Sequence, residues 1–295
     1  MPTLLDFRRR IRSIKNTQQI TRAMKFVAAA KLRRAQENVL AARPYAHQMV
    51  SLMRSAMARI ENPTHPLMAR RAEKRVRLLV VTGDKGLCGA FNTNVLRRSL
   101  EFLREHEDLQ IGVVPIGKKG RDALRKRRAT LVDEYVGIFM RLNFANAKEI
   151  TEKLVAGYSA KEIDAVYVVY NEFKSVLAQK LTVDKLLPID AGELAGSEPA
   201  GGDAARTALN VDYIYEQPAQ EVLNRLLPRY VETQVYRYLL ESAAAEYAAR
   251  MTAMDAATSN AGELIDKLTL HMNKVRQAAI TKEIIEVVSG AAAAQ

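Results

Sequence analysis

The two ends of this 295-residue chain carry long amphipathic segments, and these constrain the fold more than any single motif. In the first segment, positions that can face a partner helix recur at alternating spacings of three and four, which is typical of a coiled-coil seam. The polar members in the middle of this seam weaken the pairing but fix its register. The seam positions are Leu4, Phe7, Ile11, Ile14, Gln18, Thr21, Lys25, Ala28, Leu32, Ala35, Val39 and Ala42.

The C-terminal segment repeats the pattern. After Pro228 it contains no further proline, and Gly262 is the only glycine before Gly290. A helix over residues 229–289 would be about 90 Å long at 1.5 Å per residue, so it must project from the body or line something large. We therefore expect the two terminal helices to form an antiparallel coiled coil, a shaft with a body attached. The C-terminal seam positions are Met251, Met254, Thr258, Ala261, Ile265, Leu268, Met272, Val275 and Ala279.

Local signals place the ends of the first helix. Thr3 and Asp6 have the spacing of a variant capping box, which predicts a helix start. Pro44 removes a backbone hydrogen bond and is expected to kink or pause the helix. The run of Asn and Pro at residues 62–66 predicts a firm stop.

The middle of the chain alternates between strand and helix patterns, which predicts a small, largely parallel, Rossmann-like α/β domain over residues 76–189. Strands are expected at residues 76–82, 111–117, 163–170 and 175–189, and helices at residues 92–106 and 144–159. The predicted segments are an N-terminal coiled-coil helix (1–61), a linker (62–75), the central domain (76–189), a loop or foot (190–218) and a C-terminal coiled-coil helix (219–295).

The glycine-rich turn after the first strand is interpreted as structural. Gly83, Gly86 and Gly89 follow a G-x-x-G-x-x-G spacing, which is neither the dinucleotide fingerprint nor a P-loop. The four histidines are scattered without metal-ligand spacing. The single cysteine, Cys88, is more typical of a small buried residue than of a nucleophile. We predict no catalytic residue, no metal site and no cofactor.

Charge is concentrated at the N-terminus. The chain carries a formal net charge of +12, and residues 1–43 hold eleven Lys and Arg against two acids. A basic helix of this kind indicates an acidic partner, which could be nucleic acid, anionic lipid or an acidic protein surface. The alternative is that the basic residues only form a solvated face of the helix. No stretch approaches the roughly 20 apolar residues that span a membrane. We expect a soluble chain on the cytosolic side, without direct membrane insertion.

Several blocks closely resemble the γ subunit of bacterial F-type ATP synthases. The first is residues 14–24 (IKNTQQITRAM), and the second is residues 84–92 (DKGLCGAFN). The long C-terminal stretch resembles the same family, including residues 249–258, 273–283 (NKVRQAAITKE) and 286–291. The resemblance covers the whole chain in the right order.

The resemblance implies a rotor shaft. In that family the terminal helices form an antiparallel coiled coil inside a ring of alternating α and β subunits. The α/β lobe sits below that ring with the ε subunit, on the membrane ring of c subunits. Rotation of the c ring turns the shaft, which drives the β sites through different conformations during ATP synthesis or hydrolysis. The γ chain is non-catalytic, and it is peripheral to the cytoplasmic face of the bacterial inner membrane.

The resemblance also assigns residues. Tyr213, Tyr215 and Glu216 match the foot that meets ε and the c ring, although core packing is an equal alternative for the tyrosines. Residues 287–291 form a small, apolar tip that would suit a low-friction bearing. Lys25 departs from the acidic residue of some members, so its ion-pair partner is open. The expected contacts to the α/β ring are Met24, Lys25, Arg250, Arg276, Gln277, Thr281 and Glu283.

Two other functions fit parts of the sequence. A nucleic-acid-binding protein would use the basic N-terminal helix and would show steeply salt-dependent binding. However, aromatic residues are not interleaved with the basic cluster. A nucleotide-dependent enzyme built on the central domain would need a phosphate loop, and the glycine spacing does not provide one. The rotor-shaft function is the prediction.

Overall fold

The computed structural model describes residues 3–57, 59–60, 64–190 and 218–293. Two long helices begin and end the described chain: α1 (Leu4–Met57) and α7 (Ala219–Ala293). The chain divides into two compact units, and both helices contribute to each. Residues 1–29 and 250–295 form the first unit, called here the helical pair, and residues 30–249 form the second, called the lobe.

The start of α1 confirms the predicted capping box. The backbone N–H of Thr3 donates to Asp6 Oδ2 at 2.9 Å, and the backbone N–H of Asp6 donates to Thr3 Oγ1 at 3.3 Å. The first of these hydrogen bonds is the main reason that the pKa of the Asp6 carboxyl lies below its usual value. These reciprocal bonds satisfy donors that the first turn would otherwise leave unpaired.

The predicted pause at Pro44 is wrong, because α1 continues through this residue to Met57. A proline inside a helix leaves the carbonyl of the residue four positions earlier without its donor. Here that residue is Leu40, and both Leu40 and Pro44 are exposed, so water can reach the freed carbonyl. The helix therefore tolerates the proline at its solvent side.

The lobe contains a four-stranded sheet in the order β2-β1-β3-β4. Strands β1 (Arg75–Val81), β2 (Gln110–Ile116) and β3 (Ala165–Phe173) are parallel, and β4 (Gln179–Leu187) is antiparallel to β3. The largely parallel α/β domain predicted from the sequence is confirmed. Strand β3 extends three residues beyond its predicted end, and β4 starts four residues later than predicted, because residues 174–178 form the turn between them.

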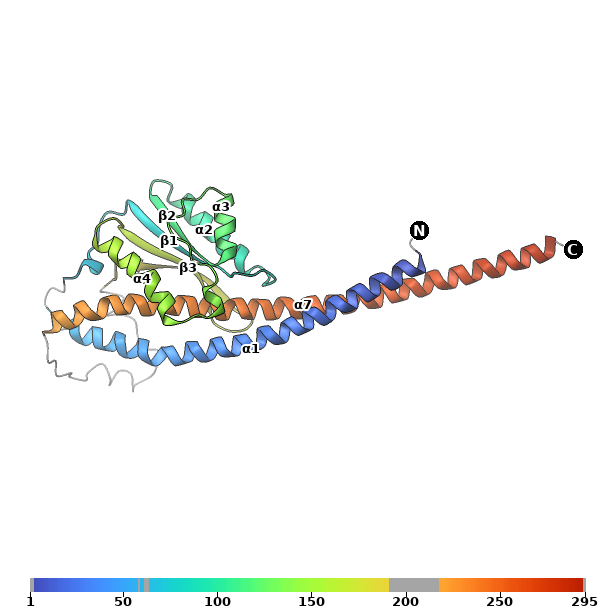
Figure 1. Ribbon diagram of the computed structural model, residues 1–295, viewed down its shortest axis with the longest axis horizontal. Coiled ribbons are helices and arrows are strands. Elements are labelled where there is room, and N and C mark those ends of the chain that lie inside the picture. The colour runs from blue at the N-terminus through green and yellow to red at the C-terminus, as the bar shows by residue number, and fades with distance from the viewer. Residues whose placement is uncertain (1–2, 58, 61–63, 191–217, 294–295) are drawn as a thin grey trace. The chain divides into compact units, whose positions relative to one another are not determined.

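Both faces of this sheet are covered (Figure 1). Helices α2 (Phe91–Glu105) and α3 (Lys118–Lys126) pack on one face, and α4 (Phe144–Ser159) packs on the other with the lobe segments of α1 and α7. Strand β1 shows why: Leu78 and Val80 join the core under α2, while alternate residues Leu79 and Val81 join the core under α4. Each such buried side chain stabilises the fold by about 1.5–3 kcal/mol.

Helix α3 was not predicted. Its sequence is dominated by Lys and Arg, and only Gly120 and Leu124 are buried, so the apolar periodicity is too sparse to indicate a helix. The helix begins after Gly117, which has a φ of 101°. A Cβ at this position would lie 2.1 Å from the carbonyl oxygen of Thr82, so only glycine fits. Tertiary contact with the β1 turn therefore sets the start of α3.

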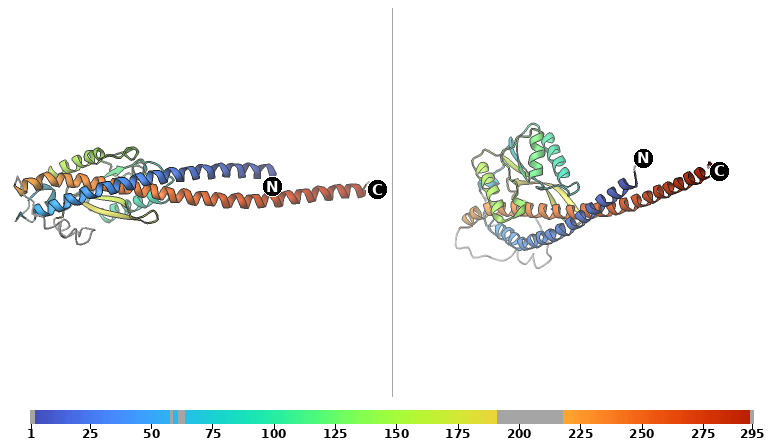
Figure 2. Two further views of the ribbon diagram at one scale, coloured as in Figure 1. Left: turned by 90° about the horizontal axis from the view of Figure 1, so that it is seen from below. Right: turned by 45° about the vertical axis from the view of Figure 1, so that its right-hand side comes forward.

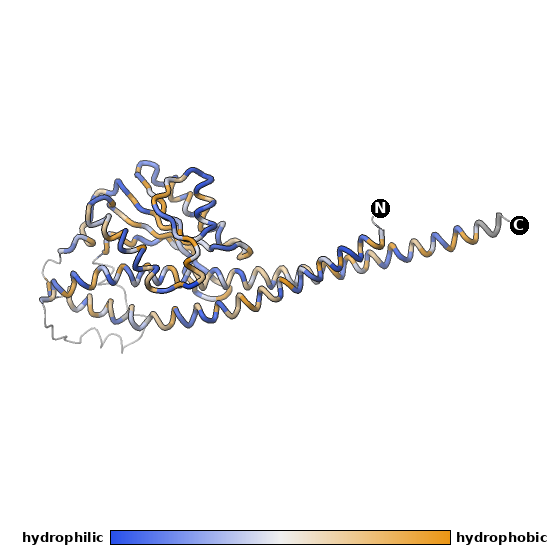
Figure 3. Tube along the Cα trace, in the orientation of Figure 1, coloured by the Kyte–Doolittle hydropathy of each residue, from blue (hydrophilic) through white to orange (hydrophobic). Residues whose placement is uncertain are grey.

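The helical pair confirms the predicted antiparallel coiled coil. Phe7 contacts His271 at a ring-centroid distance of 5.1 Å, while Lys25 contacts Asp255, so one helix ascends as the other descends. The two helical segments run side by side in every view (Figure 2). All predicted seam positions in this unit are buried or half-buried. Hydrophobic and hydrophilic residues alternate along both segments, as expected for a seam with a solvated outer face (Figure 3).

Candidate interaction surface of the helical pair

Polar residues of the two seams meet in the middle of the helical pair. The side-chain amide of Gln18 donates to the carbonyl of Thr258 at 3.3 Å. The hydroxyls of Thr21 and Thr258 share a hydrogen bond of 2.8 Å. These contacts join the two helices at this level of the seam, and polar contacts of this kind favour a single register. The polar patch therefore makes the contacts that a register-fixing role requires, and that role stays a prediction.

Lys25 has an ion-pair partner within the chain. Its Nζ lies 2.6 Å from Asp255 Oδ1, and the two side chains are 36% and 62% exposed. The partner that the sequence left open is therefore on the facing helix. Asp255 was not singled out from the sequence, because nothing in a local pattern says which residues 230 positions apart will face each other.

The predicted ring contacts fall into two groups. Met24, Lys25 and Arg250 are half-buried and lie in the stretch where α1 and α7 are paired. The second group lies 26 residues or more beyond Arg250 along α7, which is about 40 Å at the rise of an α-helix. Its members, Arg276, Gln277, Thr281 and Glu283, are all exposed.

Large apolar side chains lie exposed beside both groups. On α1, Ile20, Phe26 and Val27 are 60%, 61% and 56% exposed. The sequence pattern did not identify these residues, because they lie outside the three-four spacing of the seam. Large apolar residues at positions outside the seam could have indicated an interaction surface. Exposed apolar surface of this kind marks interaction sites. The corresponding residues on α7 are Ile280, Ile284, Ile285, Val287 and Val288.

The last described turns of the helical pair come from α7 alone. Every residue from Ile280 to Ser289 is exposed, so no segment of the described chain covers them. The Thr281 hydroxyl donates a local hydrogen bond to the carbonyl of Gln277 at 2.9 Å. The end of the helix thus presents apolar, charged and hydroxyl groups together. The predicted foot residues Tyr213, Tyr215 and Glu216 lie outside the described residues.

The glycine-rich turn holds the chain's own groups where a phosphate would bind. Asp84 Oδ1 accepts hydrogen bonds from the backbone N–H groups of Lys118 and Gly137, both at 3.0 Å. Thr82 Oγ1 accepts from the backbone N–H of Gly120 at 2.8 Å. A carboxylate and a hydroxyl thus occupy the donors at the start of α3, which are the groups that bind anions at a free helix N-terminus. This geometry supports the structural interpretation of the turn.

Helix α7 crosses the lobe at the carboxyl ends of β1 and β3. Ser242 Oγ accepts from the backbone N–H of Asn171 at 3.3 Å, and Ala245 packs in a small core with Cys88 and Phe91. The carboxylate of Glu246 lies so close to Gly83 that a Cβ there would be 2.6 Å from its Oε1. In open α/β sheets this switch point of strand order is where ligands bind. In the lobe, α7 fills it.

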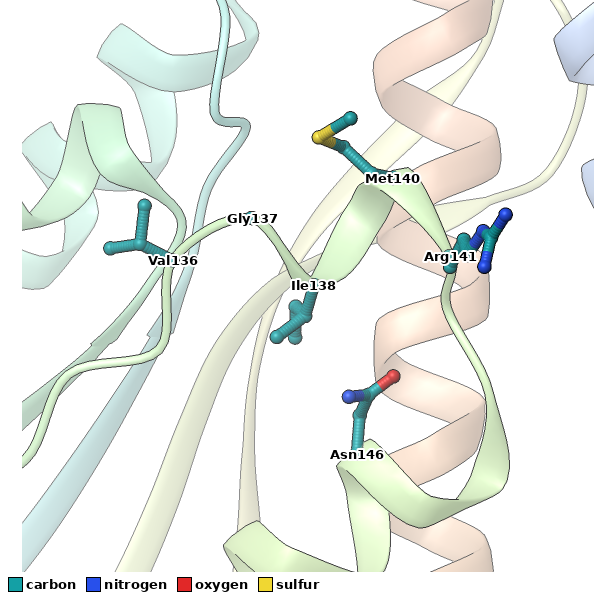
Figure 4. A pocket seen from close by; sticks show the side chains of 6 residues that line it. All are labelled: Val136, Gly137, Ile138, Met140, Arg141 and Asn146. Carbon is teal, nitrogen blue, oxygen red and sulfur yellow. The ribbon is translucent and has the colours of Figure 1, made fainter.

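An open pocket of about 440 Å³ lies between residues 136–141, in the segment after α3, and the start of α4 (Figure 4). Val136, Gly137, Ile138 and Met140 supply most of its lining. Its amide residue, Asn146, already accepts a hydrogen bond from the backbone N–H of Asn143 in the capping box of α4. Arg141 also lines the pocket, so a ligand would meet one guanidinium and an amide that is already engaged.

Within the described ranges, no three or more His, Cys, Asp or Glu side chains are grouped so that they could hold a metal ion. In the same part of the chain, no helix combines the length and the apolar character that crossing a membrane requires.

Comparisons with known proteins agree along the whole chain. The ATP synthase family model matches residues 3–294. The ATP synthase gamma chain of Solibacter usitatus is 54% identical over 299 residues, with 100% of both chains covered. That of Pelotomaculum thermopropionicum is 48% identical, with 99% of each chain covered.

Solved structures show the same fold. A chain of the central stalk and c-ring structure of Tetrahymena thermophila mitochondrial ATP synthase has a TM-score of 0.60 and 26% identity, covering 81% of this chain and 99% of that chain. A chain of the Euglena gracilis mitochondrial ATP synthase has a TM-score of 0.66 at 21% identity, covering 98% and 94%. With an antiparallel helical pair, a mixed α/β lobe and full-length relatives of one kind, this chain belongs to the ATP synthase gamma-chain family.

Proposed function

We propose that this chain is the central rotor shaft of the F1 sector of ATP synthase. In this role it couples ion-driven rotation of the c ring to conformational change at the catalytic sites of the β subunits, during ATP synthesis or hydrolysis. It performs no catalysis itself. The observation that carries the proposal is the end of α7, where ten consecutive exposed residues, 280–289, combine apolar and charged side chains without a covering segment.

The helical pair has the properties that such a shaft needs. A seam locked by Gln18, Thr21 and Thr258 resists sliding of one helix along the other, so that the pair can transmit torque. Helix α7 continues beyond the start of α1. The shaft therefore consists of two helices along part of its length and of α7 alone near its end. Because such a shaft is asymmetric, it can contact each of three otherwise equivalent β subunits differently.

The site residues are proposed as contacts to the surrounding α and β subunits. Met24, Lys25 and Arg250 would form the group where the helices are paired. Arg276, Gln277, Thr281 and Glu283 would form the group near the end of α7. The basic N-terminal helix suits an acidic surface on the β subunits, since opposite charges steer association. Its arginines, Arg8, Arg9 and Arg10, are exposed.

The remaining partners belong to the same proposal. Tyr213, Tyr215 and Glu216 would meet the ε subunit and the c ring. The chain would be peripheral to the cytoplasmic face of the bacterial inner membrane, held there by the c ring and without inserting into the bilayer. We propose no nucleic-acid partner.

Co-expression with the α and β subunits of a bacterial F-type ATPase tests the shaft role. We expect a stable complex that hydrolyses ATP and turns a bead attached to the lobe in steps. Leu177 is 87% exposed, so Leu177→Cys provides the attachment point, and Cys88→Ala removes the buried native thiol. Failure to co-purify, together with DNA binding that falls steeply with salt, would show that the basic helix is a nucleic-acid arm instead.

The proposed contacts need a matched control. Arg276→Ala with Gln277→Ala should lower coupled ATP synthesis about 5–30-fold, the effect of losing one or two interface anchors of 1–2 kcal/mol. Arg97→Ala with Asn94→Ala, on the solvated side of α2, should leave synthesis unchanged. Equal effects of the two pairs would contradict the assignment of the α7 group.

A further inference from the structure

The outer side of α3 carries a dense basic cluster that the shaft role does not use. Residues 118–128 contain seven Lys and Arg and one acid, Asp122. The three consecutive residues Lys126, Arg127 and Arg128 are exposed and follow directly on Arg125. They belong to the lobe and not to the helical pair. Lys126, Arg127 and Arg128 are called here the α3 basic cluster.

The lobe's own carboxylates leave this cluster unmatched. Glu134 is held between Arg121 and Arg125, with N–O distances of 3.6 Å and 2.7 Å. Among the described residues, no carboxylate lies within ion-pair distance of Lys126, Arg127 or Arg128. Three adjacent cations repel one another, and the negative end of the α3 dipole compensates only part of that repulsion.

Arg128 occupies a backbone position that disfavours it. The N–H of Ala129 donates to the carbonyl of Leu124 and the N–H of Arg128 donates to that of Arg125, which closes α3 in a Schellman-type turn. Arg128 has a φ of 58°, in the left-handed region that glycine normally occupies at such a helix end. An L-residue there costs roughly 1 kcal/mol, and the side chain is exposed and forms no ion pair with a described carboxylate. Because glycine is unstrained in this conformation, Arg128→Gly can remove the charge without destabilising the end of the helix.

The chemistry of the cluster favours carboxylates. Glu134 already demonstrates how arginines of α3 hold a carboxylate from another segment. Insertion of this helix into a membrane interface would need exposed apolar side chains, yet Leu124 is buried in the core. Base stacking would need aromatic residues, and residues 118–128 contain none. We propose that the α3 basic cluster is a docking surface for a carboxylate-rich segment of a partner polypeptide.

A titration of the full chain with a fluorescent 12-residue oligoglutamate peptide tests this proposal. The cluster variant, Lys126→Gln with Arg127→Gln and Arg128→Gly, should bind the peptide about tenfold more weakly, because it loses three partly screened ion pairs. The control variant, Arg104→Gln with Lys148→Gln and Lys180→Gln, removes the same charge from exposed positions of the lobe outside the cluster. It should weaken binding by less than about twofold. An equal or larger loss in the control variant would overturn the proposal.

A single substitution separates binding from folding. Arg128→Gly relieves the left-handed backbone, so it should raise or preserve the melting temperature while weakening peptide binding. Lys161→Gly is the matched control: Lys161 ends α4 with a φ of 62° and is exposed, so it should change the melting temperature similarly and leave peptide binding unchanged. Unchanged peptide affinity in Arg128→Gly overturns the proposal.

Vesicles with 30% phosphatidylglycerol and a 20-base-pair DNA duplex complete the titration. We expect the cluster variant and wild type to differ less for these probes than for the peptide. If the cluster variant loses vesicle or DNA binding and keeps peptide binding, the cluster recognises lipid or nucleic acid and the proposal is wrong.

Discussion

Lys25 illustrates how a charged side chain can occupy a coiled-coil seam. Its aliphatic stem is half-buried beside the facing helix, while its ammonium reaches Asp255 at the rim. The seam position of Lys25 was predictable from spacing alone. Its partner was not, because the register between two segments far apart in sequence depends on the packing of the whole pair.

The ion pair between Lys25 and Asp255 should contribute little to stability. Both side chains are more than a third exposed, so water and salt screen the attraction. A double-mutant cycle with Lys25→Ala and Asp255→Ala should give a coupling energy of about 0.2–1 kcal/mol, measured by urea unfolding. The coupling should fall in 1 M salt. A coupling above about 2 kcal/mol would mean that the pair is desolvated.

Asp164 should make stability depend on pH. Its side chain is 7% exposed. Burial alone would raise the pKa of this carboxyl, but hydrogen bonds from the backbone N–H groups of Arg75 and Lys74, and from the Arg75 guanidinium, hold the pKa below its usual value. A lowered folded-state pKa stabilises the protein above the unfolded value of about 3.9, and this stabilisation disappears as the pH falls through the folded-state pKa.

Asp164→Asn should therefore lower the free energy of unfolding by about 1–3 kcal/mol at pH 7, because buried donors lose a charged acceptor. The difference from wild type should shrink below about pH 4. Urea unfolding between pH 3 and pH 7 measures both. The exposed Asp108→Asn serves as the control and should stay within about 0.5 kcal/mol at every pH. A difference for Asp164→Asn that is constant over this range would show that charge is not its cause.

At the scale of elements, the sequence predicted those helices and strands whose cores follow a clear period. Helix α4 was predicted with its observed bounds, since its buried positions repeat at helical spacing. Helix α3 was missed because its stability comes from tertiary contact, with Gly120 packed on Thr82. The predicted contacts of the shaft remain predictions, because exposed residues of one chain do not reveal which neighbour they touch.

The contact between α7 and the turn after β1 leads to a prediction about stability. Gly83→Ala would place its Cβ 2.6 Å from Glu246 Oε1, and Glu246 is only 4% exposed, so the carboxylate has little room to move. Overpacking of this kind costs about 1–3 kcal/mol in the free energy of unfolding. Gly86→Ala is the control, because its nearest contact would be an ordinary 3.7 Å.

A second substitution tests whether Glu246 causes that loss. In the Glu246→Ala background, Gly83→Ala should lower the free energy of unfolding by less than it does in the wild-type protein, because the clashing carboxylate is gone. Strictly additive losses, measured by thermal unfolding, would show that the strain at Gly83 arises from another neighbour.

At the scale of the whole molecule, folding and function draw on different residues. The cores of the lobe and the seam of the helical pair use buried side chains, whereas the proposed shaft surface uses exposed ones. Changes to the exposed end of α7 should therefore separate assembly from folding. The resemblance of the sequence to its family could suggest this division, but exposure along Ile280–Ser289 had to come from the structure.

Truncation after Ile285 tests this separation. Because residues 286–289 are exposed, their removal should change the free energy of unfolding of the isolated chain by less than about 0.5 kcal/mol. In the assembled complex it should weaken subunit association and lower the torque measured on a bead. The full-length variant Val287→Ser with Val288→Ser keeps the length and removes apolar surface, so a matching loss of torque would assign the effect to apolar contact. A truncated complex with full coupling would show that the end of α7 bears no load, and the torque would then have to act on the group around Met24, Lys25 and Arg250.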